Sequence, residues 1–567
     1  MLHGRVAHLV ETLIVVAAGA AIFGSPSRLR GPLLYDDKAA VQRNPIVSGA
    51  TPLRRVWDLD FWGEHELSAA ESHKSFRPVV TLSYRLNYLL HGHDSWGYHA
   101  VNAGLHALNC ALVPPTVRAA VGWREPDELR LVPGAAALLF AVHPVHVEAV
   151  QQIVGRAELL MALFFLLGFL GYASLAVGRR ACSVGAAPAR VGLRGGAACL
   201  LALCCTLLAT LSKETGVTLP LLCIGWEAIV VLQLRPSALL SQLRPSALLR
   251  GAPRASPRAS PRACEPAATE ATAAADVADA AAAAANVADA DADAGCCGDG
   301  VTRACVAAAC VRCAMLLAGM LLLAGWRRQR NGGSAASLSI MQNMPAFLPH
   351  PGWRAVSIAW LWAEYAWSVA LPCELSPDWS YPAIPPIETV RDPRLPLLLA
   401  FLGGWAAFWW RCAIANTAPR LLMAVVGFGI VPYLLASNLL FPVGTCKAER
   451  VLYLPSLGAC MAAALALQAA CRRLRHPTLR PAAMCAAVAA LCVPLAWQCD
   501  RFATTWTDGV ALWGHTLAVQ EARGALLTGG ATTSAMCEYG MQLSWANRHR
   551  EAQAALERPV AEAEAAA

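Results

Sequence analysis

Long apolar runs separated by short polar stretches make up most of the chain. The first run covers residues 9–23, and ten more follow, at 97–117, 131–150, 159–177, 195–211, 216–233, 305–325, 395–410, 421–437, 457–470 and 481–498. A helix that crosses a bilayer needs roughly 20 predominantly apolar residues, and most of these runs approach that length. The pattern therefore predicts an all-α, polytopic membrane protein with about eleven transmembrane helices.

The first run allows two interpretations. Small residues at Ala18, Gly19 and Ala20 are typical of a signal-peptide cleavage site, but the apolar run continues to Phe23. We therefore favour a retained anchor whose amino terminus lies in the cytosol.

Composition and charge support a membrane protein over other classes. Of 567 residues, 56% are hydrophobic and only 15% are charged, whereas soluble domains carry roughly a quarter charged residues. The formal net charge is +8, almost all of it from arginine. Because the arginines lie between apolar runs and form no aromatic-interleaved patch, they indicate membrane topology and exclude nucleic acid as the expected partner.

Arginine clusters set the expected orientation. Positive loops face the cytosol, and a cytosolic amino terminus places nearly all clusters there: Arg118, Arg124 and Arg130; Arg179, Arg180 and Arg190; 235–262; Arg411 and Arg420; Arg472, Arg473, Arg475 and Arg480. The exception is Arg327, Arg328 and Arg330. Counting the Trp-rich run 353–371 as a span would move the last cluster outside, so we interpret that run as an interfacial helix.

This topology predicts two domains. Residues 1–498 form a multi-span domain, and residues 499–567 form a short helical tail on the same side as the first outward loop. The multi-span domain contains that first loop at 25–95 and a second large outward loop at 326–394. Residues 234–304 are an expected cytosolic insertion of low complexity, with too few branched or aromatic residues to build a core.

Ionisable side chains gather at the outward ends of several spans. Asp36 and Asp37 stand just beyond the first apolar run. The others lie in the outward loops or at span ends: His73, Lys74, Arg77, His99, His143, His146, Glu148, Arg156, Glu158, Lys213, Glu214, Glu449 and Arg450. Charged groups at membrane depth are costly and commonly functional. Their convergence on one face predicts a chemical site there.

Seven motifs in order resemble one family, the transmembrane O-mannosyltransferases that carry tetratricopeptide repeats and target cadherins. The motifs are Asp36-Asp37; His73-Lys74-Ser75 with Arg77-Pro78; His143-Pro144-Val145-His146-Val147-Glu148-Ala149-Val150; Gly155-Arg156-Ala157-Glu158; Ser212-Lys213-Glu214; Asp378-Trp379-Ser380 with Ile384-Pro385; and Ala448-Glu449-Arg450-Val451-Leu452-Tyr453-Leu454-Pro455. Each is weak alone, but seven in sequence are specific. The resemblance as a whole covers about residues 25–500, apart from the low-complexity insertion.

The resemblance implies a GT-C fold in the endoplasmic reticulum membrane, with a lumenal active site. The implied reaction transfers mannose from dolichyl phosphate mannose, a polyisoprenyl-phosphate sugar donor, to Ser or Thr hydroxyls of secretory-pathway proteins, without a cofactor. Either Asp36 or Asp37 would be the general base. Arg156, Lys213 and Arg450 would bind the donor phosphate. The remaining ionisable residues named above are candidates for the substrate site.

Alternatives remain open at three points. His143, His146 and Glu148 have the spacing of a metal triad, but similar enzymes are generally metal-independent, so no metal is expected. The tail faintly matches one tetratricopeptide repeat, around Tyr539 and Ala546. This repeat is either degenerate or truncated, because a lone repeat cannot bury its own apolar face. The chain could also be a GT-C transferase for another lipid-linked sugar or acceptor, or a membrane scaffold without catalysis.

Overall fold

A computed structural model describes residues 2–121, 130–176, 188–234, 303–333, 336, 338–414, 418–526 and 531–566. These residues form helices joined by loops and contain no strand beyond an isolated bridge between Leu59 and Glu66. The low-complexity insertion expected at 234–304 lies outside them except at its ends.

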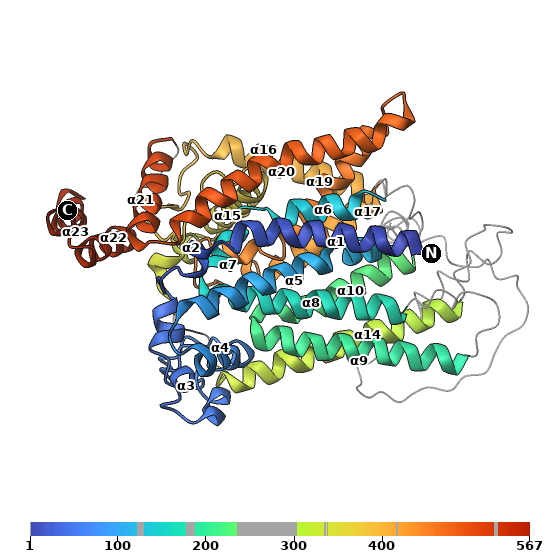
Figure 1. Cartoon of the computed structure of the whole chain (residues 1–567), viewed down its shortest axis with the longest axis horizontal. Helices are drawn as coiled ribbons and strands as arrows, with labels where there is room; N and C mark the ends of the chain where they lie inside the picture. The colour runs from blue at the N-terminus through green and yellow to red at the C-terminus, as the bar shows by residue number, and fades with distance from the viewer. Residues whose placement is uncertain are drawn as a thin grey trace, which may run out of the picture.

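Long helices run side by side along the molecule (Figure 1). They are α1 (Leu2–Phe23), α5 (Ser95–Val121), α8 (Arg156–Ala176), α9 (Pro188–Ser212), α14 (Arg303–Arg330) and α20 (Arg480–Thr505). Shorter helices complete the bundle: α6 (Val132–Ala141), α7 (His146–Gln151), α10 (Leu219–Trp226), α16 (Leu395–Trp409), α17 (Pro419–Leu422), α18 (Val431–Tyr433) and α19 (Ser456–Cys471).

The remaining helices lie at one end of the bundle. They are α2 (Pro26–Leu29), α3 (Pro45–Ser48), α4 (Pro78–His91), α15 (Pro351–Ala370), and the tail helices α21 (Gly509–Leu526), α22 (Thr533–Trp545) and α23 (His549–Ala566). The amino terminus lies at the opposite end (Figure 1). The first loop and the tail thus share one end of the molecule, which we call the loop end.

The predicted fold class, an all-α polytopic membrane protein, is confirmed. Eight helical segments among the described residues are long and apolar enough to cross a bilayer: Val6–Phe23, Ile153–Ala176, Leu193–Ser212, Glu214–Val231, Val306–Arg330, Leu395–Cys412, Pro419–Ala436 and Pro477–Thr505. The other three expected spans correspond to α5, α6 and α19. Of these, α6 and α19 are apolar but short. The Trp-rich α15 is not among the eight segments.

The span expected at 131–150 is not continuous, and this expectation needs correction. Helix α6 ends at Ala141, and α7 begins only at His146. Pro144 lies between them, and proline cannot donate a helical hydrogen bond. Because of this break, α7 and its residue Glu148 lie at the loop end of the bundle.

Close helix contacts assemble the core. A Cβ added at Gly168 of α8 would lie 2.7 Å from Cys205 Cβ of α9 and 2.5 Å from a Leu219 methyl of α10. Membrane helices commonly use such small residues to let neighbours approach. The Phe140 ring of α6 is also fully buried and contacts the rings of His106 and Tyr453.

Candidate active site

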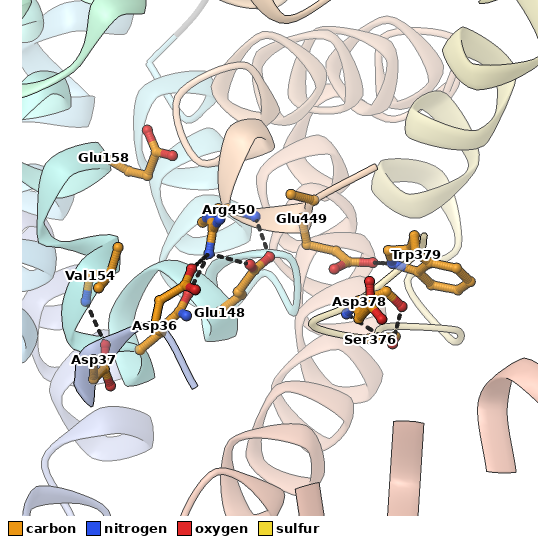
Figure 2. A network of polar contacts seen from close by, with 12 residues as sticks. Asp36, Asp37, Glu148, Val154, Glu158, Ser376, Asp378, Trp379, Glu449 and Arg450 are labelled. Carbon is orange, nitrogen blue, oxygen red and sulfur yellow. Dashed lines mark hydrogen bonds and ion pairs between the residues drawn. The ribbon is translucent and has the colours of Figure 1, made fainter. Parts of the chain in front are cut away.

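The two adjacent carboxylates of the first loop have different surroundings. Asp37 is 1% exposed, and its Oδ1 atom accepts a hydrogen bond from the Val154 backbone N–H at 2.9 Å. Burial raises the pKa of Asp37 to about 7, although backbone hydrogen bonds oppose the shift. The Asp36 side chain is 25% exposed and turns toward Arg450 (Figure 2). Asp36 is therefore the accessible carboxylate, and Asp37 fixes the loop to the turn before α8.

Arg450 lies at the centre of the site (Figure 2). Its Nη1 atom lies 3.4 Å from Asp36 Oδ2, 3.2 Å from Glu148 Oε1 and 2.7 Å from Gln152 Oε1. Its backbone N–H also donates to Glu148 Oε2 at 2.8 Å. Helix α7 supplies Glu148, and the 3-10 turn Glu449–Leu452 supplies Arg450. The arginine thus joins the first loop, α7 and this turn.

A second cation stands near this centre. The Lys213 ammonium forms an ion pair with the Glu158 carboxylate near the start of α8. Figure 2 shows Glu158 on the helix beside Arg450 and Glu148. Lys213 lies just beyond α9, so the break after that helix brings a lysine to the loop end. Two cations and three carboxylates of the predicted set therefore share one region.

Glu449 faces the opposite side of the same turn. It is 1% exposed, and its Oε1 atom accepts a hydrogen bond from Trp379 Nε1 at 2.8 Å, while Oε2 has no hydrogen-bond partner. Burial raises the pKa of Glu449 to about 8; the Lys447 cation lowers it and the Glu148 carboxylate raises it. Burial of the carboxyl group, with Oε2 left without a partner, thus favours its protonated form.

Arg156, which is expected to bind the donor phosphate, lies outside this region and has other partners in the structure. The guanidinium is fully buried and donates to Asn102 Oδ1 at 2.9 Å, to Asn87 Oδ1 at 2.6 Å and to the Tyr98 carbonyl at 2.9 Å. A further donor reaches Ser83 Oγ at 3.2 Å. With its donors used internally, Arg156 ties α8 to α4 and α5.

Arg77 and Glu214 form a separate cluster with Arg327. Glu214 accepts from Arg77 at 3.2 Å and from Arg327 at 2.7 Å. Arg327 also donates to the carbonyl oxygens of Phe76 and Thr210. These partners give a physical reason for the arginine exception at the end of α14: protein groups at the loop end neutralise and cap its charge.

His73 and Lys74 shape the first loop. The Lys74 ammonium is buried and donates to the Leu67 carbonyl at 3.1 Å and to the Ala69 carbonyl at 2.6 Å. The His73 ring bonds the Ser75 hydroxyl, and burial lowers its pKa. Neither side chain reaches Arg450 through a contact in the structure.

The other histidines lie inside the bundle with partners of their own. His99 Nε2 lies 3.2 Å from the Gly31 carbonyl, His143 Nε2 lies 3.0 Å from the Val369 carbonyl, and His146 Nε2 lies 2.8 Å from Ser456 Oγ. Within the described part of the chain, no three His, Cys, Asp or Glu side chains are grouped so that they could hold a metal ion.

Several residues around the site escape sequence reasoning. Gln152, which accepts a hydrogen bond from Arg450, belongs to none of the seven motifs. Trp379 belongs to one of them, but the sequence does not show that its ring N–H donates to Glu449. Glu364 of α15 forms ion pairs with Lys447 and with Arg523 of the tail. A lone acid in a Trp-rich apolar helix is the signal that could have identified Glu364.

A family model described as "Protein O-mannosyl-transferase TMTC, DUF1736" matches residues 332–406, the segment that contains α15 and Trp379. Three similar proteins show how far the likeness extends. Protein O-mannosyl-transferase Tmtc3 of Drosophila melanogaster is 32% identical over 78% of this chain and 44% of its own length. Protein O-mannosyl-transferase TMTC4 of Homo sapiens is 30% identical over 79% of this chain and 54% of its own length.

Protein O-mannosyl-transferase TMTC1 of Mus musculus is 30% identical over 78% of this chain and 48% of its own length. The chain thus spans about half the length of the curated relatives it matches. No solved structure matches it.

Proposed function

The chain belongs to the family of TMTC protein O-mannosyl-transferases, as its motifs predicted, and on that premise we propose that it transfers mannose to Ser or Thr hydroxyls of proteins. The proposed donor is dolichyl phosphate mannose. The proposed location is the endoplasmic reticulum membrane, with a GT-C-type fold whose loop end faces the lumen. The proposed acceptors are secretory or membrane proteins.

One observation supports this proposal most directly: an accessible carboxylate lies beside a cation. Asp36 Oδ2 lies 3.4 Å from Arg450 Nη1 at the loop end of the bundle. Transfer from a lipid phosphate needs a base for the acceptor and a positive group for the departing phosphate. Asp36 would supply the base and Arg450 the positive group, and the two side chains are in contact.

The proposed reaction is a single in-line displacement. The acceptor oxygen forms a bond to the anomeric carbon while the bond from that carbon to the phosphate oxygen breaks. The acceptor proton passes to the Asp36 carboxylate, and the lipid phosphate leaves with the electron pair. The configuration at the anomeric carbon is inverted. Asp37, buried and bonded to the Val154 backbone, keeps the loop in place while Asp36 acts.

Negative charge on the departing phosphate calls for nearby cations. Arg450 is the first candidate, because a guanidinium can give two parallel hydrogen bonds to phosphate. Lys213, paired with Glu158, is the second. Glu148 and Gln152 hold the Arg450 guanidinium in position between them.

The test is mannose transfer by the full chain in microsomes that lack related transferases. Labelled dolichyl phosphate mannose is supplied with Ser/Thr acceptor peptides, and dolichyl phosphate glucose serves as the donor control. The proposal expects mannose on hydroxyl groups, with inverted linkage. Labelling from the glucose donor alone contradicts the proposed sugar, and no labelling from either donor contradicts a transferase.

A further inference from the structure

The first two tail helices contact the loop that carries Asp36. The Tyr35 ring lies 5.4 Å from the Trp513 ring of α21 in an edge arrangement, and Lys38 Nζ lies 4.1 Å above the Trp545 ring of α22. Figure 1 shows α21 and α22 at the loop end. The tail is thus packed beside the candidate active site.

The tail also holds the second outward loop, through Asp378. The Thr532 hydroxyl, at the start of α22, donates to Asp378 Oδ2 at 2.8 Å. Gln520 of α21 donates to the Asp378 carbonyl at 2.7 Å and accepts from the Thr532 backbone N–H at 2.9 Å. Thr532 and Gln520 are each 1% exposed, and Asp378 is 5% exposed. Hydrogen bonds at such depth require their partners, because water cannot replace them.

A buried cation of the tail reinforces this contact. Arg523 of α21 is 5% exposed and forms ion pairs with Glu364 of α15 and with Glu374, the latter at 2.9 Å. Its guanidinium also lies 5.5 Å from the Trp379 ring, which Lys447 approaches at 4.1 Å. A fully buried ion pair adds little net stability over an apolar contact, whereas it fixes geometry where partners must meet in one way.

From Asp378 the contacts continue to the site. Asp378 Oδ1 accepts from the Ser380 backbone N–H at 3.0 Å, which closes the turn around Trp379. Trp379 Nε1 donates to Glu449 at 2.8 Å (Figure 2). Glu449 immediately precedes Arg450, whose guanidinium contacts Asp36. We call this path, from Thr532 through Asp378, Trp379 and Glu449 to Arg450, the tail relay.

We propose that Thr532 is a positioning residue of the transferase, which acts through the tail relay to hold Arg450 beside Asp36, while Arg523 holds α21 against α15. The first two tail helices are then part of the catalytic unit. This inference rests on the proposed function. Misplacing a group by about 1 Å can reduce a rate by roughly 100-fold, so a relay of buried hydrogen bonds can control the rate from the tail.

The test compares two buried threonines of the tail. Thr532→Val removes the donor to Asp378 and also the hydroxyl that accepts from the Ala535 backbone N–H at the start of α22, whereas Thr532→Ser keeps both hydrogen bonds. Thr516→Val is the control for loss of a buried threonine hydroxyl in the tail, because the Thr516 hydroxyl donates to the Leu512 carbonyl of its own helix. Trp379→Phe interrupts the relay at a second point while it keeps an aromatic ring. Activity is measured per folded protein, in the full chain.

The relay predicts that Thr532→Val and Trp379→Phe lower kcat by roughly 10- to 100-fold with little change in KM for the donor. Thr532→Ser and Thr516→Val stay within about twofold of wild type by the same argument. Backbone hydrogen exchange should rise at residues 449–453 in Thr532→Val but not in Thr516→Val.

Equal loss of kcat in the two valine variants overturns the proposal, as does unchanged exchange at 449–453 in Thr532→Val. If the wild-type chain transfers no mannose, the proposed function fails by itself. The exchange comparison still decides the relay in that case, because it requires no substrate.

Discussion

Arg450 and Asp36 are 414 positions apart in the sequence, yet Arg450 Nη1 lies 3.4 Å from Asp36 Oδ2. This contact joins the first loop to the turn before α19 at the loop end. Glu148 Oε1 lies 3.2 Å from the same nitrogen. A donor phosphate placed beside this guanidinium would also be next to the carboxylate that takes the acceptor proton.

Removing the Arg450 cation should lower turnover. For Arg450→Met we expect kcat to fall by roughly 100-fold, since loss of one donor to a developing anion typically costs 10²–10³ in rate. Arg450→Lys should recover only part of the loss, because an ammonium cannot give paired hydrogen bonds. Steady-state mannose transfer measures both.

Arg54→Gln is the control, since Arg54 is an exposed arginine of the first loop, which also carries Asp36. Its kcat should equal that of wild type. Equal turnover in Arg450→Met and wild type would contradict the phosphate role of Arg450.

Arg156 should prove structural. Arg156→Met leaves the buried amide oxygens of Asn87 and Asn102 without their donor. We expect a loss of about 3 kcal/mol in stability, from hydrogen bonds to a charged group that are worth roughly 1.5–3 kcal/mol each. The thermal midpoint of the detergent-purified chain measures it. A variant of wild-type stability that transfers no mannose would instead restore Arg156 to the phosphate site.

Asp37 should make stability depend on pH. A carboxyl group whose pKa is about 7 in the folded chain and about 3.9 when unfolded binds its proton more tightly in the folded state. Its contribution is therefore most favourable below pH 4 and is lost as the pH rises to 7, by about 4 kcal/mol in total. Asp37→Asn keeps an oxygen acceptor for the Val154 N–H but has no charge to bury.

The thermal midpoint of wild type relative to Asp37→Asn should accordingly fall between pH 5 and pH 7.5 and then level off. Asp58→Asn, at a half-exposed carboxylate of the same loop, provides the comparison. A constant difference between wild type and Asp37→Asn over this range would show that Asp37 is not protonated in the folded chain.

Glycosylation mapping tests the orientation. The sequence contains no Asn-x-Ser/Thr acceptor. A glycan can therefore be attached only at an acceptor that is introduced. His549→Thr completes an acceptor at Asn547, between α22 and α23 at the loop end. We expect a glycan on it in microsomes, because the loop end is proposed to face the lumen. An Asn-Gly-Thr insert after Arg475, in the loop between α19 and α20, should stay unmodified. The reverse pattern contradicts the orientation.

Sequence reasoning succeeds where one local property decides the structure. Apolar length places α1, α8, α9 and α20 close to their expected spans. The motif resemblance selects Asp36 and Arg450 as site residues, and the structure brings these two side chains within 3.4 Å of each other. Sequence reasoning does not predict the surroundings of Arg156, whose position in a conspicuous motif suggests chemistry. The donors of Arg156 bind the side chains of Asn87 and Asn102, which come from distant segments of the chain. No local sequence pattern predicts these contacts.

The tail illustrates the same limit. One faint repeat predicts helices, and α21–α23 are present. Their contact with Asp378 depends on a hydroxyl and an amide that are ordinary residues in the sequence. The break between α6 and α7 lies at Pro144, but α5 and α20 continue through internal prolines, so a proline alone does not predict it.

The most direct measurement is single-turnover mannose transfer by Asp36→Asn and Asp37→Asn beside wild type, with folding checked by thermal midpoint. If Asp36 is the base, Asp36→Asn should lower the rate by at least about 100-fold at every pH, as expected for loss of a general base. Asp37→Asn should keep most of the wild-type rate. Transfer by Asp36→Asn at the wild-type rate would contradict the account.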